Sequence, residues 1–350
     1  MIAVRSPKIK LLLFSIMHLV TDGLCSYLVF SKLYSDNIKF AFYIFVGYNI
    51  LAFVTQSPIG ALIDKHNRPK LFLAISILSM ILGYVFSGVW FLAVTFIGIA
   101  NSIFHVAGGK YITDKSGNDI SHLGIFVSTG AVGLVLGQRY LSFELMPYLF
   151  FALLIISGLL VIFSEDSETV DYPEKFEDKK LETFALLAIV GVVAIRSFVG
   201  KVVTPDFTLS GHMFLVMAIF TALGKAAGGI CSRIFGIKPT TLVSMLTAAI
   251  CLTLGAGNPA LFVFGIFAFN FSMPITLYYA NILLKGNEGF AFGTLAAALT
   301  PGYFIAMSFT YSTPMRVFTA MLCLISMLTI IIVSRKIINN ADCLNTDSNS

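Results

Sequence analysis

The sequence predicts an all-α integral membrane protein with twelve transmembrane helices arranged as two six-helix halves. The first observation is composition: of the 350 residues, 57% are hydrophobic, only 12% are charged, and the mean hydropathy is +0.89. A soluble domain needs far less apolar surface, so composition indicates a membrane protein. The second is the regular return of long apolar segments, and the third is one long polar run that divides these segments equally.

Dividing the chain at charges, prolines and glycine turns gives twelve segments of about the 20 apolar residues that cross a hydrocarbon core. The first segment has no small-residue cleavage site, so we interpret it as a mature helix and not a signal peptide. Two boundaries depend on tight turns without a charge, in SGVW and in GAGNPA. The predicted spans are 10–30, 40–63, 70–88, 90–110, 122–139, 146–164, 183–203, 210–231, 239–256, 258–283, 289–311 and 314–334.

The basic residues support this count, because Lys and Arg accumulate in the cytoplasmic loops of membrane proteins. With the N-terminus inside, 16 of the 23 Lys and Arg fall on the cytoplasmic side, and Arg196 and Lys225 fall within spans. We therefore expect a multi-pass protein of the cell membrane, the bacterial inner membrane, with both termini cytoplasmic. The basic residues form no single patch, so we expect no nucleic-acid partner, and we expect a monomer. The five outer basic residues are Lys32, Lys39, Arg139, Lys201 and Arg316.

The long polar run, SEDSETVDYPEKFEDKKLE, extends from Ser164 to Glu182. Such charged runs are typical of solvated linkers, and this one separates six spans from six. The predicted organisation is an N-terminal half (1–164), a cytoplasmic linker (165–182), a C-terminal half (183–338) and a cytoplasmic tail (339–350).

The two halves carry related loops after their second spans. GALIDKHNRPK starts at Gly60, and GGICSRIFGIKP occupies the equivalent place in the second half, with Ser232 where the first has Asp64. Gly60 allows close helix approach, and Asp64 can meet the positive N-terminus of a neighbouring helix. With Lys65 and Arg68, these residues form either a cytoplasmic gate that breaks in another conformation or a basic loop that only sets orientation.

Titratable residues inside the apolar segments are rare and costly, so they indicate function. In MHLVTDG, His18 and Asp22 are four residues apart on one helical face and titrate as a coupled pair. His105, Arg196 and Lys225 complete the set. The pair either moves protons or pins the first helix. Lys225 is close enough to its helix end to extend its amine toward the interface, so we assign it a structural role.

At these residues the chain resembles the major facilitator superfamily. GALIDKHNRPK is similar to that family's loop signature G-x-x-x-D-R-x-G-R-R, although Asn67 and Pro69 depart from it. HLVTD, IANSIFH, IRSFVG and the glycine pattern STGAVGLVLG resemble the branch of the fosmidomycin resistance efflux proteins. Val106 replaces a common proline, and Gln138 follows Gly137 where antiporters have Gly-Pro.

The resemblance implies that the first, fourth, seventh and tenth helices line a central cavity for substrate and protons. Arg196 would then neutralise an anionic substrate or hold Asp22 deprotonated. The predicted cavity residues are His18, Asp22, Asn101, His105, Arg196, Ser197 and Asn270.

These features favour a secondary transporter that works by alternating access. Proton antiport that expels a drug or metabolite is the function the resemblance implies; proton-coupled or passive uptake of a metabolite, and a transport-inactive receptor or scaffold, are the alternatives. The chain lacks a Walker A motif and the HExxH, GxGD and GxSG motifs, so we expect no ATP drive and no enzyme. We also expect no cofactor and no metal site, only a proton gradient and a small-molecule substrate. The five cysteines show no CxxC spacing.

Overall fold

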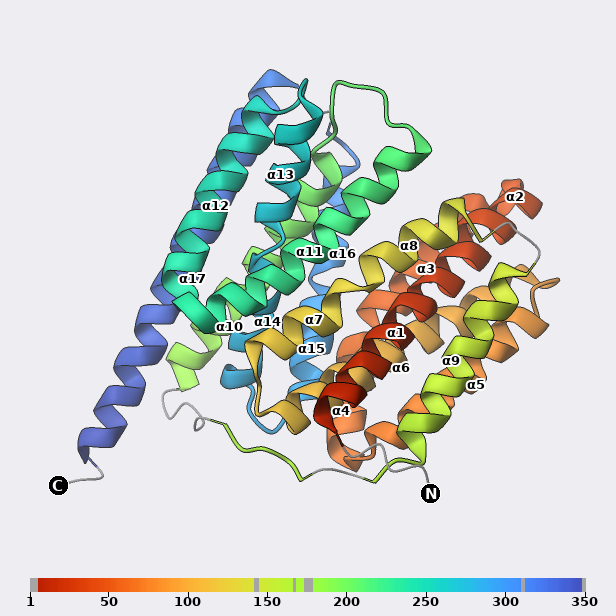
Figure 1. The fold of residues 1–350 in the computed structure, drawn as a ribbon, viewed down its shortest axis with the longest axis horizontal. Coiled ribbons are helices and arrows are strands. Elements are labelled where there is room, and N and C mark those ends of the chain that lie inside the picture. The colour runs from red at the N-terminus through yellow and green to blue at the C-terminus, as the bar shows by residue number, and fades with distance from the viewer. Residues whose placement is uncertain (1–5, 142–144, 166–167, 173–178, 310–311, 348–350) are drawn as a thin grey trace.

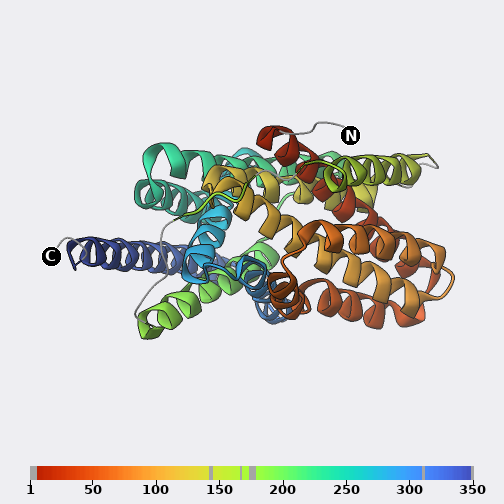
Figure 2. The same ribbon diagram turned by 90° about the horizontal axis from the view of Figure 1, so that it is seen from below.

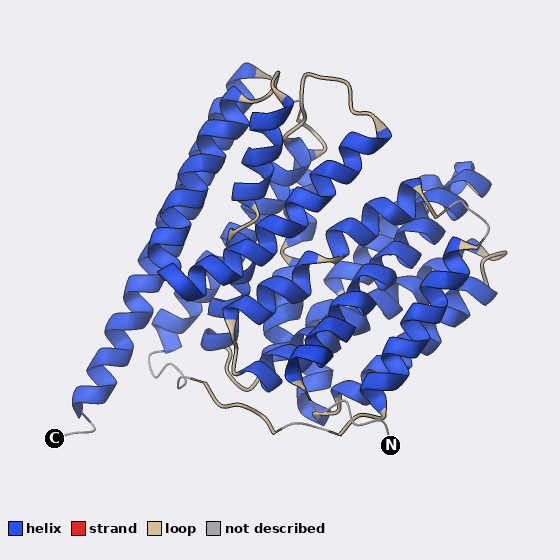
Figure 3. Cartoon of the chain, in the orientation of Figure 1, coloured by secondary structure: helices blue, strands red, loops and turns tan. Residues whose placement is uncertain are grey.

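The computed structural model describes residues 6–141, 145–165, 168–172, 179–309 and 312–347. All regular structure in these ranges is helical, and they contain no strand (Figure 3). The predicted fold class is therefore confirmed. Arg5 and Lys175, which we counted as cytoplasmic charges, lie outside the described residues.

The N-terminal half contains the first six spans. Prolines at the starts of α1, α5 and α9 suit the first turn of a helix, where the backbone N–H has no intrahelical acceptor. The spans are, in order, α1 (Pro7–Ser26) with η1 (Tyr27–Leu33) and α2 (Tyr34–Asp36); η2 (Ile38–Phe40), α3 (Ala41–Asn49), η3 (Ile50–Val54) and α4 (Gln56–His66); α5 (Pro69–Val85); α6 (Trp90–Ser116); α7 (Ile120–Ser128) with α8 (Gly130–Arg139); and α9 (Met146–Ile162).

The C-terminal half contains the other six. Ser210 and Asn258 cap the N-termini of their helices by accepting backbone N–H bonds. The spans are α10 (Lys179–Val202); α11 (Gly211–Phe235); α12 (Ile237–Leu254); α13 (Pro259–Phe269) with α14 (Ser272–Leu283); α15 (Glu288–Ala297) with α16 (Leu299–Ala306); and α17 (Thr313–Asp347).

Ten of these spans, as the structure describes them, have the length and hydropathy of membrane-crossing helices. The other two, α5 and α9, are apolar but have only 17 residues each. The uncharged turns predicted in SGVW and GAGNPA are both present. Several helices extend past their predicted ends: the fourth continues to Ser116, and α17 continues to Asp347, beyond the predicted boundary at 338. Hydropathy ends a span at its first charge, but a helix continues where its charges have partners.

Three spans are interrupted four residues before a proline. η3 ends at Val54, four residues before Pro58; α13 gives way to α14 at Asn270, before Pro274; and α15 ends at Ala297, before Pro301. A proline has no N–H for the carbonyl four residues earlier, so the regular hydrogen-bond ladder fails there. Pro58 and Pro301 thus mark interruptions of the second and eleventh spans.

The two halves lie side by side and converge toward the end of the molecule where both termini lie (Figure 1). The view turned by 90° also separates the red-to-yellow N-terminal half from the green-to-blue C-terminal half, with α17 extending away from both (Figure 2). We call the converging end the closed end. Glycines allow the halves to approach there, as described below.

Candidate functional site

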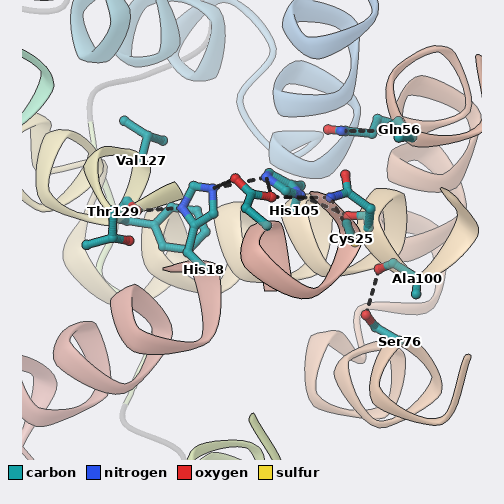
Figure 4. Close-up of polar contacts among 12 residues, drawn as sticks. His18, Cys25, Gln56, Ser76, Ala100, His105, Val127 and Thr129 are labelled. Carbon is teal, nitrogen blue, oxygen red and sulfur yellow. Dashed lines mark hydrogen bonds and ion pairs between the residues drawn. The ribbon is translucent and has the colours of Figure 1, made fainter. Parts of the chain in front are cut away.

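His18, Asp22 and His105 form one buried cluster, which we call the His–Asp cluster. His18 Nε2 lies 3.4 Å from Asp22 Oδ2, and His105 Nε2 lies 3.5 Å from Asp22 Oδ1. The two Nε2 atoms are 3.0 Å apart. Figure 4 shows His18 of α1 and His105 of α6 pointing toward one another. The structure therefore brings together the pair predicted in the first span and the histidine of the fourth.

The outer nitrogens of both imidazoles face backbone carbonyls. His18 Nδ1 lies 2.7 Å from the Phe126 carbonyl oxygen, and His105 Nδ1 lies 2.9 Å from that of Asn101. A carbonyl accepts only, so each Nδ1 carries the proton and each neutral ring turns a lone pair at Nε2 inward. Two lone pairs 3.0 Å apart repel unless a cation lies between them. A proton placed between the two Nε2 atoms would remove this repulsion.

Asn101, another of the predicted cavity residues, also contacts this cluster. Its Nδ2 donates to Asp22 Oδ1 at 3.2 Å and approaches Cys25 Sγ at 3.6 Å. Its Oδ1 is buried and has no partner among the described residues. Asn101 thus holds the carboxylate in place and leaves one acceptor free.

The glycines of the fifth span make room for the cluster. A Cβ at Gly130, in α8, would overlap Asp22 Oδ2 and His18 Nε2. At Gly133 and Gly137 it would overlap the carbonyl oxygens of Leu19 and Gly23 in α1. The glycine pattern therefore allows α8 to pack directly against α1 beside the titratable groups.

Two cations of the C-terminal half belong to this region, and Lys225 is the one within electrostatic range of the cluster. Lys225, in α11, donates to the Val127 carbonyl at 3.2 Å and lies within electrostatic range of Asp22 and Arg196. Arg196, in α10, has a buried Nη1 without a hydrogen-bond partner in the described chain. Our expectation that the Lys225 amine extends to the helix end is wrong: it crosses to the N-terminal half instead, because its helix face points at the fifth span.

Ser197 and Asn270 do not join these groups. Ser197 Oγ donates to the Leu299 carbonyl at 2.6 Å, and Asn270 Nδ2 donates to the Ile266 carbonyl at 2.8 Å. Both side chains satisfy backbone carbonyls, Asn270 at the interruption of its own span. Neither side chain makes a hydrogen bond to the His–Asp cluster in the described part of the chain, and their place in the cavity stays a prediction.

The His–Asp cluster also has the residue types of a metal site. One donor atom from each of His18, Asp22 and His105 lies within 4.8 Å of the others. Lys225 adds a positive charge within electrostatic range of Asp22, which opposes a divalent cation.

At the closed end, α4 packs against α15 of the other half. A Cβ at Gly60 would overlap the Gly289 carbonyl, so the two backbones are in direct contact. Asp64 accepts from the backbone N–H groups of Gly289 at 2.9 Å and Phe290 at 2.8 Å. The contact we predicted between Asp64 and a helix N-terminus is present. We call this contact the α4–α15 gate.

The basic partner of Asp64 is Lys110, which the sequence did not single out. Its Nζ lies 3.3 Å from Asp64 Oδ1, 3.3 Å from Asp114 Oδ2 and 3.1 Å from Glu288 Oε2. Lys65 and Arg68, which we expected in this gate, are exposed and have no partner in the described chain. Asp64 faces inward, so its neighbour Lys65 is turned about 100° away around the helix.

Part of the linker lies across this network. Tyr172 donates its hydroxyl to Glu288 Oε1 at 2.6 Å, and Lys285 pairs with Asp171 at 2.7 Å. Burial, together with the Glu288 carboxylate, raises the pKa of Tyr172 above its ordinary value, so the phenol stays a donor. The linker is thus anchored to the C-terminal half by polar contacts.

A second gate joins α7 and α11 at the same end. Gly124 and Gly229 face one another so closely that a Cβ on either would meet the other's backbone. Arg233 Nη1 lies 2.7 Å from Asp119 Oδ2, and Asp119 caps α7 by accepting from the Ser121 N–H at 2.8 Å. Burial opposes ionisation of Asp119, but the Ser121 hydrogen bonds, His122 and Arg233 outweigh it and lower its pKa. We call this contact the α7–α11 gate.

The opposite end is joined by side chains. Phe45 lies against Tyr303 and Phe304, with ring centroids 5.9 and 6.3 Å away. Arg139 covers the Phe214 ring at 4.6 Å. These contacts join side chains, whereas the closed end brings backbones together. The end with glycine contacts is therefore the more tightly sealed.

The class of fold follows from comparison with known proteins. The family model of the Major Facilitator Superfamily matches residues 38–202. A search of curated proteins gives no match. The chain is a multi-pass membrane protein with the twelve-span, two-half fold of major facilitator transporters.

Solved structures share this fold over nearly the whole chain. The Escherichia coli fucose:proton symporter aligns with a TM-score of 0.66 and 13% identity, covering 94% of this chain and 99% of its own. The human organic anion transporter MFSD10 gives 0.66 and 14%, with 93% and 100% covered. A bacterial homologue of the iron transporter ferroportin, in an outward-facing state, gives 0.62 and 14%, with 96% and 100% covered. These low identities establish the fold alone.

Proposed function

We propose that this protein is a proton-coupled secondary transporter of a small molecule that works by alternating access. The observation that supports this most is the His–Asp cluster, in which two inward lone pairs and a carboxylate share one buried position. A proton bound there changes the charge between the two halves, so its gain or loss alters how they interact. The gates at the closed end give the halves a contact that can form and break.

The proposed direction is efflux by antiport, with a drug or metabolite as substrate. It is supported by the resemblance of the first, fourth, fifth and seventh helices to an efflux branch. Proton symport for uptake is the second candidate, and one observation favours it: a protonated cluster facing Lys225 and Arg196 attracts an anion more strongly than a neutral one. Gln138, at the usual antiporter proline, favours symport too.

Flux into proteoliposomes tests the coupling. Compounds that stabilise the purified protein would be loaded, and a pH gradient imposed in each direction. We expect accumulation against the compound's gradient, driven by an opposite proton flow for antiport and by a parallel flow for symport. Asp22→Asn should reduce this coupled flux at least about tenfold, because it removes the carboxylate that holds the proton.

Asp206→Asn is the matched control, because Asp206 is a half-exposed carboxylate paired with Arg316 outside the cluster. It should leave coupled flux unchanged. If Asp22→Asn also left it unchanged, the proton-relay assignment would be wrong. If no stabilising compound moved at all, the protein would be a receptor on a transporter fold.

A further inference from the structure

We infer that Arg196 and Lys225 form a subsite for the carboxylate group of a small organic monoanion. This inference rests on the proposed function, because it names the substrate class of the same cavity. Three features support it: Arg196 Nη1 has no partner in the described chain, Lys225 lies within electrostatic range of Arg196, and the two halves together carry a net positive charge at this depth.

Arg196 is a permanent cation without a counter-ion. Its guanidinium cannot lose a proton in a protein. Its Nη1 is shielded from solvent, and the described residues offer it no hydrogen bond or ion pair. A buried N–H donor that lacks a partner is unfavourable, and an oxygen of a bound ligand would supply that partner. A guanidinium offers parallel N–H donors that match the two oxygens of a carboxylate.

Lys225 supplies a second donor next to the first. Its amine has three donors, and in the described chain it uses one, to the Val127 carbonyl. It lies within electrostatic range of Arg196. An anion that binds the unpartnered Arg196 donor would therefore also be attracted by the Lys225 amine.

The charge balance favours a monoanion. Of the charged groups that face one another between the halves at this depth, Arg196 and Lys225 contribute two positive charges and Asp22 one negative charge. Without a proton on the His–Asp cluster, one positive charge remains and one carboxylate neutralises it; a proton bound between the histidines adds a second positive charge and strengthens the attraction for the anion.

Thermal unfolding of the detergent-purified full chain tests this subsite. The probes are benzoate and lactate, each compared with its neutral amide, benzamide or lactamide, and with inorganic phosphate. We expect both carboxylates to raise the unfolding temperature in a saturable way, because a ligand that binds the native state stabilises it. The amides and phosphate should not.

Variants locate the effect. Arg196→Gln and Lys225→Gln should each weaken the apparent benzoate affinity at least about tenfold, and Arg196→Lys should restore part of it. Lys201→Gln is the matched control, since Lys201 is an exposed cation on the same helix, α10. It should bind benzoate as the unaltered protein does.

Equal stabilisation by benzoate and benzamide, or by phosphate, would overturn the inference. So would carboxylate binding that survives both the Arg196 and the Lys225 change. If one variant does not fold, the comparison of acid with amide on the unaltered protein still decides. The two proposals fail separately. If carboxylates do not stabilise the unaltered protein, the subsite alone is refuted. If Asp22→Asn leaves coupled flux unchanged, the proton relay alone is refuted.

Discussion

The glycine at position 130 controls the geometry of the His–Asp cluster. Adding a methyl group there places a Cβ on Asp22 Oδ2 and His18 Nε2. We expect Gly130→Ala to displace the shared proton position and lower coupled flux at least about tenfold, as misplacement of about 1 Å does in other sites. Proteoliposome flux measures it. Gly191→Ala is the control, because a Cβ at Gly191 meets nothing within 4 Å; equal loss in both variants would contradict a local effect.

At this scale, sequence reasoning found one side of the site and missed part of the other. His18 and Asp22 follow from helical spacing, because residues four apart lie on one face. His105 required the resemblance to place its helix next to the first. The contact of Lys225 with the fifth span was missed because hydropathy gives the depth of a residue but not which neighbour its face meets. Ser197 and Asn270 had the right depth and turned toward backbone carbonyls.

Among the elements, α4 and α15 form the contact most sensitive to size. The Gly60 backbone touches that of Gly289, so a methyl group cannot be accommodated by a rotamer change. We expect Gly60→Ala to shift the population away from the closed arrangement by about tenfold, equivalent to about 1.4 kcal/mol. The distance between spin labels at Arg68 and Ile234, in a background without native cysteines, measures this shift. An unchanged distance distribution would show that the gate does not limit closure.

The elements themselves were largely predictable, because twelve apolar segments and the prolines within them determine where spans and kinks occur. The Asp64 contact was predictable from its motif. The pairing of Lys110 with Glu288 was not predictable, since in the sequence each looks like an ordinary charged residue at the end of a helix. Their pairing joins positions 178 residues apart, which no local pattern reveals.

Across the whole molecule, the two gates are counterparts with opposite chemistry. The α4–α15 gate joins the second span to the eleventh, with a carboxylate at a helix N-terminus. The α7–α11 gate joins the fifth to the eighth, where Arg233 meets an acidic N-cap. In the second half Ser232 stands where the first half has Asp64, and the next residue, Arg233, makes the contact. Each half therefore supplies one gate helix and one receiving N-terminus.

The charge pair of the α7–α11 gate should be insensitive to pH in the physiological range. Interactions in the closed state lower the pKa of Asp119, so their stabilisation is present above the ordinary Asp range, about pH 4, and is lost only as pH falls through the lowered value. Arg233 is exposed, so we expect Arg233→Gln to lower the closed population only about two- to fivefold. The factor should be the same at about pH 5.5 and about pH 8.

The distance between spin labels at Arg68 and Ile234 measures the closed population at both pH values. His122 also faces this carboxylate, at 3.7 Å, so the comparison is made in a His122→Gln background. We then expect the remaining pH dependence of the closed population in this range to decrease in Asp22→Asn, because we place the transported proton at the His–Asp cluster; Asp114, 3.3 Å from Lys110 in the α4–α15 gate, is the carboxyl that could retain part of it. If the Arg233→Gln effect vanished at the lower pH while Asp22→Asn changed nothing, the pH response would belong to the gate and not to the cluster.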